Sequence, residues 1–276
     1  RWTRMMRSAR SGFAACARVL MTSFAANNIL PFRIGDIMRV FTYAPDLGAS
    51  PSVILSTVIL EKLLDIFVLV LLFVAFMGRG VGAHSRIVAW SLLAVSTGGL
   101  LVMLLGARVL EPFLCRLFAK APPNARWTPL VRKIEHWILL ALDCIRQIGI
   151  SGSLLLLVQS FIIWTFEGMI YVSAARLVGL AVDRIGPWQA VSVANLSYLI
   201  PSSPGAIGTF EWAVKTSLVS HGAQEGQAAL FGLALHAWLL VSVTGAGGVM
   251  FLMHRLRMHK RASLIEEIET LPTEML

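Results

Sequence analysis

The sequence contains 276 residues, of which 57% are hydrophobic and 14% are charged, and its mean hydropathy is +0.74. These values exclude an ordinary soluble domain and predict an integral membrane protein. The formal charge of +9 does not indicate a nucleic-acid partner. The basic residues fall in short loops between apolar runs, where membrane topology and anionic lipid headgroups account for them. The three cysteines are too few for a disulfide or zinc framework, and we expect no metal and no cofactor.

Four apolar stretches are long enough to cross a bilayer, which takes about 20 residues. They are residues 52–77, 87–107, 153–178 and 227–253. Two further apolar stretches, residues 12–43 and 188–221, are interrupted near the middle. Because each half of these two stretches is too short to span alone, we predict that both form re-entrant helical hairpins.

The interruptions carry residues that break helices. The first reads Asn27-Asn-Ile-Leu-Pro31, and the second, residues 201–211, reads Pro-Ser-Ser-Pro-Gly-Ala-Ile-Gly-Thr-Phe-Glu. Proline lacks an amide donor, and glycine permits turns that a bulkier residue resists. At membrane depth such a break survives only inside protein or against a polar cavity, as in the broken helices of transporters. The alternative interpretation of residues 201–211 is an external loop between two spans.

The longest polar connection, residues 108–152, carries apolar residues at helical spacing and a basic opposite face. This pattern suits either a helix on the membrane surface or a cytosolic helix packed on the core. The positive-inside rule places the connection in the cytoplasm, together with the start of the chain and the tail 254–276. The first hairpin then enters from the cytoplasm and the second from outside, so the halves 12–107 and 153–253 are inverted.

A faint internal repeat agrees with this arrangement, since Pro31-x-x-x-Gly35 corresponds to Pro201-x-x-x-Gly205. Inverted repeats with paired broken helices are typical of secondary transporters, although chance similarity in a biased sequence is the alternative. The predicted fold class is an all-α polytopic membrane protein with a single transmembrane domain over residues 1–276. It comprises about four spanning helices plus two re-entrant helical hairpins arranged as inverted repeats.

Ionisable side chains in apolar segments cost a few kcal/mol on insertion scales, so they normally face a partner or water. Arg33 and Asp36 are spaced to pair at i, i+3. That pairing leaves Arg39 free for a phosphate, whose oxygens match the two parallel donors of a guanidinium group. The alternative is a simple interfacial salt bridge.

Glu61 and Asp65 lie four residues apart and share one face of their helix. They suit proton carriage, because two like charges on one low-dielectric face disfavour joint ionisation. In the alternative interpretation they neutralise Arg33 and Arg39 of the neighbouring hairpin. Glu167 lies mid-span, where a lone carboxylate is either protonated or paired and is functional by default.

Glu211 and Lys215 begin the helix after the second interruption and are also spaced at i, i+4. Their pairing is either simple helix support or part of a headgroup site. In the second case Glu211 meets a headgroup amine while free amides at the helix N-terminus meet its phosphate. His236 in the last span is expected to be a hydrogen-bonded packing residue.

Three segments stand out in chain order: Asn28-Ile-Leu-Pro-Phe-Arg-Ile-Gly-Asp36 with Arg39, Glu61-Lys-Leu-Leu-Asp65, and residues 201–211. Together they resemble the flippase-like transmembrane family, which includes the membrane region of lysylphosphatidylglycerol synthase. The resemblance implies a polytopic protein of the bacterial cytoplasmic (inner) membrane that moves a lipid or a lipid-linked precursor between leaflets. The family usually has further spanning helices before the first motif, so we expect this chain to lack its first helices. We also expect the chain to lack the soluble aminoacyl-transferase domain of the synthase.

The leading hypothesis is a lipid flippase-like transporter, not an enzyme, that moves an anionic phospholipid or lipid-linked precursor. Membrane lipids are the expected partners, and a lipid-modifying transferase and a second copy of the chain are further candidates. One rival is a non-catalytic scaffold subunit of a lipid or glycan biosynthetic complex. Another is a membrane-embedded lipid-phosphate enzyme that uses Asp36, Glu61 and Asp65 as metal or base groups. The expected substrate-binding residues are Asn28, Arg33, Asp36, Arg39, Glu61, Asp65, Glu167, Ser202, Ser203, Gly205, Gly208, Glu211 and Lys215.

Overall fold

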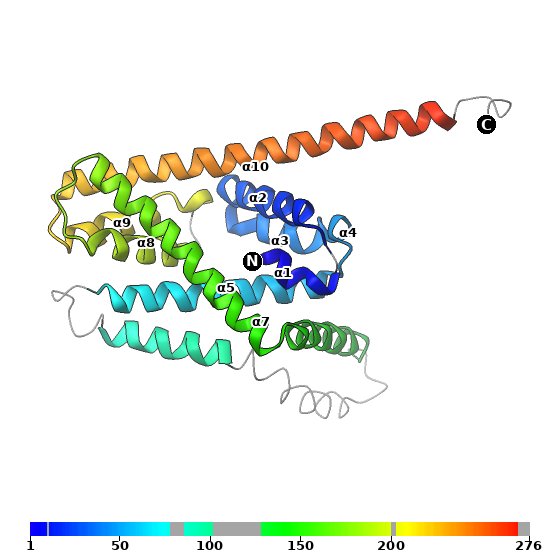
Figure 1. Cartoon of the computed structure of the whole chain (residues 1–276), viewed down its shortest axis with the longest axis horizontal. Helices are drawn as coiled ribbons and strands as arrows, with labels where there is room; N and C mark the ends of the chain where they lie inside the picture. Colours follow the sequence, from blue (N-terminus) through cyan, green and yellow to red (C-terminus); the bar gives the residue numbers. More distant parts are fainter. Residues whose placement is uncertain (10, 78–85, 102–127, 200–202, 270–276) are drawn as a thin grey trace.

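The computed structural model describes residues 1–9, 11–77, 86–101, 128–199 and 203–269, and every regular element within these ranges is a helix (Figure 1). Two described helical segments, Arg146–Leu177 and Glu225–His259, are long and apolar enough to cross a membrane. They correspond to the predicted spans 153–178 and 227–253. The first lies in α7 (Thr128–Leu177) and the second in α10 (Glu225–Glu269).

The other two predicted spans are helical where the structure describes them. The stretch 52–77 matches α5 (Pro51–Ala75), whose 25 residues extend about 37 Å at 1.5 Å per residue. The stretch 87–107 matches a shorter apolar helix, Arg86–Leu101, and the rest of it lies outside the described residues. Membrane crossing by these two helices stays a prediction.

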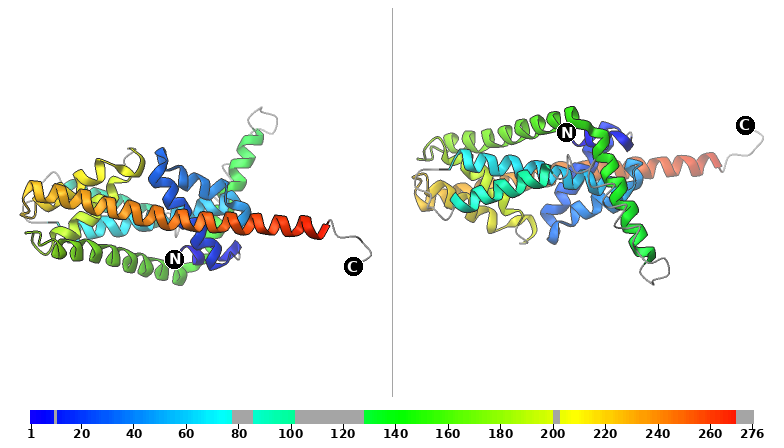
Figure 2. Two further views of the ribbon diagram at one scale, coloured as in Figure 1. Left: turned by 90° about the horizontal axis from the view of Figure 1, so that it is seen from above. Right: turned by 90° about the horizontal axis from the view of Figure 1, so that it is seen from below.

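The predicted connection 108–152 is described only from Thr128 onward. It is helical and runs directly into the long apolar part of α7. Gly149, with a φ of 67°, bends the chain between the two parts. The two views of Figure 2 show the first part of α7 projecting away from the bundle of long helices. Its placement on the membrane surface stays a prediction.

Both predicted interruptions are present. α2 (Phe13–Ile29) ends before Pro31, and the short 3₁₀ turn η2 (Pro31–Arg33) leads into α3 (Ile34–Phe41). Leu30 is extended, with φ −98° and ψ 144°, as expected for a residue that precedes proline. A Cβ on Gly35 would lie 2.0 Å from the Ser23 carbonyl oxygen. The chain therefore reverses at this turn, and α2 and α3 pack side by side.

The second interruption follows the same plan. α8 (Gly186–Ser197) and α9 (Thr209–Val219) pack against each other, and η3 (Pro204–Ala206) lies between them. Gly205 and Gly208 have φ values of 63° and 93°, a backbone region that favours glycine. A Cβ on Gly205 would lie 3.2 Å from the Asn28 carbonyl oxygen. Gly205 and Ala206 are buried against protein, whereas Ser203, Ile207 and Gly208 are exposed. The re-entrant hairpin therefore stays a prediction, with the external loop as its alternative.

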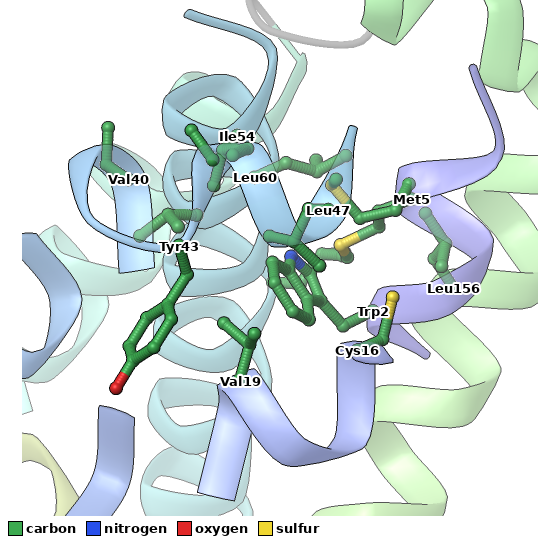
Figure 3. Packing of buried hydrophobic residues seen from close by; sticks show 14 of the residues in the cluster. Trp2, Met5, Cys16, Val19, Val40, Tyr43, Leu47, Ile54, Leu60 and Leu156 are labelled. Carbon is green, nitrogen blue, oxygen red and sulfur yellow. The ribbon is translucent and has the colours of Figure 1, made fainter. Parts of the chain in front are cut away.

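The buried apolar side chains form two cores. One joins α2, α3, α5 and the short helices α1 (Trp2–Met5) and α4 (Ala44–Leu47), with Leu156 of α7 at its edge (Figure 3). The other joins the second part of α7 with α8, α9 and the first turns of α10. The two cores broadly correspond to the two halves that the sequence predicts.

α10 packs on α2 across the boundary between the cores. A Cβ on Gly247 would lie 2.3 Å from the Met21 carbonyl oxygen and 2.6 Å from the Ala25 Cβ. A Cβ on Gly245 would have no atom within 4 Å. The close approach of these two helices therefore depends on Gly247, as in other membrane helix pairs with small residues at the interface.

A polar clasp joins the α7–α8 connection to the α9–α10 turn. Asp183 accepts hydrogen bonds from the amides of Ile185 and Gly186 at 2.9 and 2.7 Å, and its second oxygen lies 2.8 Å from His221 Nδ1. The other ring nitrogen of His221 contacts Gln189 of α8. Burial by itself would raise the pKa of Asp183, but the hydrogen bonds from His221 and the two amides hold that pKa below its ordinary value.

We predict that Gly247→Ala lowers stability and that Gly245→Ala does not. Overpacking a tight contact costs about 1–3 kcal/mol, whereas alanine at an open helical position is favoured over glycine by up to about 1 kcal/mol. Melting of the detergent-solubilised protein, followed by tryptophan fluorescence, measures both. Equal melting temperatures for the two variants would contradict the close contact.

The clasp predicts a pH effect. Because the pKa of Asp183 is lowered in the folded protein, its contribution is present above the ordinary aspartate pKa and is lost as the pH falls through the folded value. We expect the melting temperature of the wild type to fall between about pH 5 and pH 3 by more than that of Asp183→Asn. An equal fall in melting temperature at acid pH in both proteins would show that the clasp does not contribute to stability.

Candidate functional site

A cavity of about 630 Å³ lies where the two halves meet, with walls from both broken segments and from α5, α7 and α10. Several predicted binding residues do not line it, namely Asp36, Arg39, Gly208, Glu211 and Lys215. Ser202 lies outside the described residues. The predicted binding residues that do line the cavity are Asn28, Arg33, Glu61, Asp65, Glu167, Ser203 and Gly205.

The deepest ion pair beside the cavity joins α3 to α5. The guanidinium of Arg39 donates two hydrogen bonds to Glu61, at 3.2 and 2.6 Å, and the Arg39 side chain is 0% exposed. The Trp2 ring covers the guanidinium at 3.9 Å, a favourable cation–π contact. The expectation that Arg39 is free for a phosphate is therefore wrong. The interpretation in which Glu61 neutralises Arg39 agrees with the geometry.

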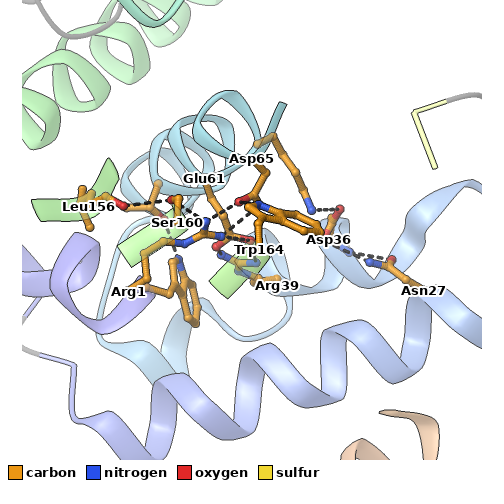
Figure 4. Close-up of polar contacts among 12 residues, drawn as sticks. Arg1, Asn27, Asp36, Arg39, Glu61, Asp65, Leu156, Ser160 and Trp164 are labelled. Carbon is orange, nitrogen blue, oxygen red and sulfur yellow. Dashed lines mark hydrogen bonds and ion pairs between the residues drawn. The ribbon is translucent and has the colours of Figure 1, made fainter. Parts of the chain in front are cut away.

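Asp65 lies one turn further along α5 and is also held by a basic partner (Figure 4). Arg1 donates to both of its oxygens, and the indole of Trp164 on α7 donates to it at 3.0 Å. Arg1 also donates to Ser160 at 2.9 Å and lies 3.9 Å from Glu61. In this inner cluster two arginines therefore balance two carboxylates.

A second cluster of charges lies beside the first break. Asp36 lies 3.4 Å from Arg33 and 3.6 Å from Lys62, and it accepts a hydrogen bond from the Asn27 amide at 3.2 Å. The predicted i, i+3 pair of Arg33 and Asp36 is thus present. The side chains of Arg33 and Lys62 both line the cavity and are 39% and 26% exposed. Two cations share one carboxylate here, which leaves one positive charge in excess.

Glu167 enters the cavity from α7 without a basic partner among the described residues. Its carboxyl group interacts with the side chain of Asn195 on α8. The Asn195 amide also donates to the Val191 carbonyl at 2.9 Å, which fixes its orientation. Of the two predicted states, protonated or paired, the described residues supply no cation for the paired one.

Glu211 and Lys215 do not pair with each other, and that prediction is wrong. One oxygen of Glu211 accepts the amide of Gly208 at 2.7 Å, and the other lies 2.8 Å from His236 Nδ1. Lys215 instead binds Glu225 at 2.8 Å. The carboxylate of Glu211 therefore caps its own helix and takes an amide that was expected to be free for a phosphate. His236 is a hydrogen-bonded packing residue, as expected.

The comparisons with known proteins decide the family. The family described as "Lysylphosphatidylglycerol synthase TM region" matches residues 1–247. The chain belongs to this family. Neither a search of curated proteins nor a search of solved structures returns a match. Membership identifies the chain as a polytopic integral membrane protein related to lipid modification.

Several cavity residues of this family member escape prediction from the sequence. Arg1 and Trp164 meet Asp65 from 64 and 99 positions away, and no local spacing signals such contacts. Lys62 reaches Asp36 on α3 from α5, a contact that its position in the sequence does not indicate. Asn195 and Tyr198 line the cavity from α8, and neither carries a charge that would single it out.

The Arg39–Glu61 pair predicts an asymmetric response to substitution. Glu61→Met leaves the Arg39 charge buried without a counter-charge and should cost about 3–5 kcal/mol, whereas Arg39→Met with Glu61→Met should recover most of that loss. Glu225→Gln, which removes a solvent-exposed partner of Lys215, serves as the control and should have little effect. Melting in detergent measures all three, and a single variant as stable as the double variant would contradict the pairing.

Proposed function

We propose that this protein moves an anionic phospholipid or a lipid-linked precursor between the leaflets of the bacterial cytoplasmic membrane. The observation that carries the proposal is the shared carboxylate of the cluster beside the first break. Arg33 and Lys62 line the cavity and share the Asp36 carboxylate, while Arg33 also donates to the Tyr198 carbonyl at 3.2 Å. This cluster therefore has one more cation than carboxylate, which suits a phosphate diester. A guanidinium and an ammonium group together match phosphate oxygens well.

The architecture we propose treats the two helix–turn–helix units as re-entrant hairpins. α2 with α3, and α8 with α9, then enter the membrane from opposite sides as inverted repeats. Their turns lie against each other, since Gly205 approaches the Asn28 backbone and Asn28 donates to Thr244 of α10 at 3.0 Å. Irregular backbone at membrane depth is tolerated beside a cavity, and transporters bind cargo between such half-helices.

The headgroup would enter the cavity while the acyl chains stay in lipid. α7 and α10 carry large apolar side chains on exposed surface, which suits contact with acyl chains. The cavity is polar on the side of α5 and η2 and apolar on the side of α10, where Leu239, Leu240 and Val243 line it. This asymmetry fits a molecule with one charged end. The exposed apolar residues include Phe166, Ile170, Leu233, Trp238 and Val241.

The rival of a lipid-phosphate enzyme is less well supported by the geometry. Asp36, Glu61 and Asp65 were its expected metal or base groups, and each is bound to basic side chains. Among the described residues, no three His, Cys, Asp or Glu side chains gather in a metal-binding group. We therefore favour transport over catalysis. The translocation experiment described next distinguishes transport from a scaffold role.

Translocation by the purified protein tests the proposal. In proteoliposomes, full-length wild type should move a fluorescent phosphatidylglycerol between leaflets faster than protein-free vesicles. Arg33→Gln and Lys62→Gln each remove the excess charge but leave Asp36 one cation, so each should slow translocation at least about tenfold, the value of one charge-assisted hydrogen bond. Arg18→Gln is the matched control, because Arg18 pairs with Asp46 at 2.9 Å and does not line the cavity.

The outcomes separate the hypotheses. Wild-type rates no higher than those of empty vesicles, for anionic and zwitterionic lipids alike, would contradict transport and favour the scaffold. Equal slowing by Arg18→Gln and Lys62→Gln would show that the excess charge at the cavity has no special role.

A further inference from the structure

His236 carries a buried imidazole ring to which the cavity contacts described above assign no functional role. Its side chain on α10 is 1% exposed, and Nδ1 lies 2.8 Å from Glu211. Its other nitrogen, Nε2, is buried and has no hydrogen-bond partner among the described residues. Because a buried N–H without an acceptor is costly, the arrangement fits the neutral tautomer, with the proton on Nδ1 and a bare nitrogen at Nε2.

Phe210 stands between this imidazole and the cavity. Its ring lines the cavity on one side and stacks on the His236 ring on the other, with centroids 4.1 Å apart and planes inclined by 21°. Tyr198, the C-cap residue of α8, packs edge-to-face with the same ring, and the two ring centroids lie 6.0 Å apart. A rotation of Phe210 would therefore bring the His236 ring into contact with the cavity.

The carboxylates of the inner cluster are poor proton carriers by comparison. Arginine stays protonated in proteins, so protonating Glu61 would leave Arg39 buried without its counter-charge. Asp65 is held in the same way by Arg1. Imidazole is the side chain that changes charge near neutral pH, at about 6.5 when unperturbed, and Glu211 is placed to stabilise its charged form.

We infer that His236 and Glu211 form a proton-binding site of the transporter, which Phe210 closes off from the cavity. This inference rests on the proposed function. A second proton binds at Nε2 and creates a buried donor that needs an acceptor. That need favours movement of Phe210, so proton binding is coupled to the opening of a path between the His236–Glu211 pair and the headgroup cavity.

Other titratable groups face this site from each neighbouring element. Tyr198 of α8 and Tyr171 of α7 both contact Phe210, and Glu167 lies near both tyrosines. On α9 itself, Lys215 is neutralised by Glu225 of α10. Among these groups Tyr171 also has an unpartnered buried atom, its hydroxyl, but a phenol already carries its proton at neutral pH.

Nitrogen NMR of the full-length protein in nanodiscs, labelled on histidine, tests proton binding directly. The sequence has six histidines, and His236→Gln identifies the resonances of His236 by their loss. We expect Nε2 of His236 to gain a proton between about pH 8 and pH 5. A His236 signal unchanged over that range overturns the inference, whether or not the protein translocates lipid.

Chemical accessibility tests the role of Phe210. Diethylpyrocarbonate modifies neutral imidazole, and mass spectrometry measures its addition to His236. We expect the wild type to be protected and Phe210→Ala to react faster, with Phe231→Ala as a control for loss of an aromatic ring from the same core. Equal rapid modification of wild type and Phe210→Ala overturns the assignment of Phe210.

The pH profile of translocation tests the coupling. Glutamine keeps the cap on α9, so Glu211→Gln removes only the charge, and it should move the profile to more acidic pH by about one unit or more. Glu225→Gln should leave the profile unchanged. Identical profiles for wild type and His236→Gln overturn the coupling, whereas absent translocation in a wild type whose His236 still titrates contradicts the proposed function and supports the proton site.

Discussion

The ion pair between Arg39 and Glu61 imposes the constraint on which the first half of the structure depends. Neither charge is tolerated alone in a buried site, because an unpaired ion costs several kcal/mol of desolvation. The bidentate geometry fixes α3 against α5, and the Trp2 ring closes the remaining side of the guanidinium. Once α3 is fixed, the turn before it must lie at the level of Glu61, beside the cavity.

The cavity follows from the two breaks. Helices fill space by packing side chains, but η2 and η3 are short turns whose backbone groups need partners inside the protein. Their meeting leaves space between two separate apolar cores. Charged side chains that the apolar cores exclude face this space. The polar lining and the irregular backbone therefore both follow from the two breaks. Arg33 and Lys62 are the cations of this lining that share a counter-ion.

The elements were predictable because they depend on local properties of the chain. Apolar runs, prolines and glycines determine where helices begin and end, and both breaks lie where the sequence predicts them. Pairing within one turn was also predictable, as for Arg33 and Asp36. Contacts between distant elements were not, because helical spacing reports only near neighbours. The pair of Arg39 with Glu61, 22 positions away, was one of two interpretations, and helical spacing could not choose between them.

The same limit explains the error at α9. Spacing alone favours a pair between Glu211 and Lys215, yet α10 brings His236 and Glu225 within reach and each pairs more closely. Gly208 adds a free amide that only the folded turn presents. The proton site we infer was therefore invisible in the sequence, where His236 is an isolated ionisable residue within the apolar stretch 227–253.

The central claim is that the cavity between the breaks holds a lipid headgroup at Arg33 and Lys62. The most direct test is mass spectrometry of the lipids that co-purify with the full-length protein in mild detergent, compared between wild type and Lys62→Gln. The account predicts that one class of anionic lipid is enriched over the host membrane with wild type and returns to the host proportion with the variant. A wild-type lipid profile that matches the bulk membrane would contradict it.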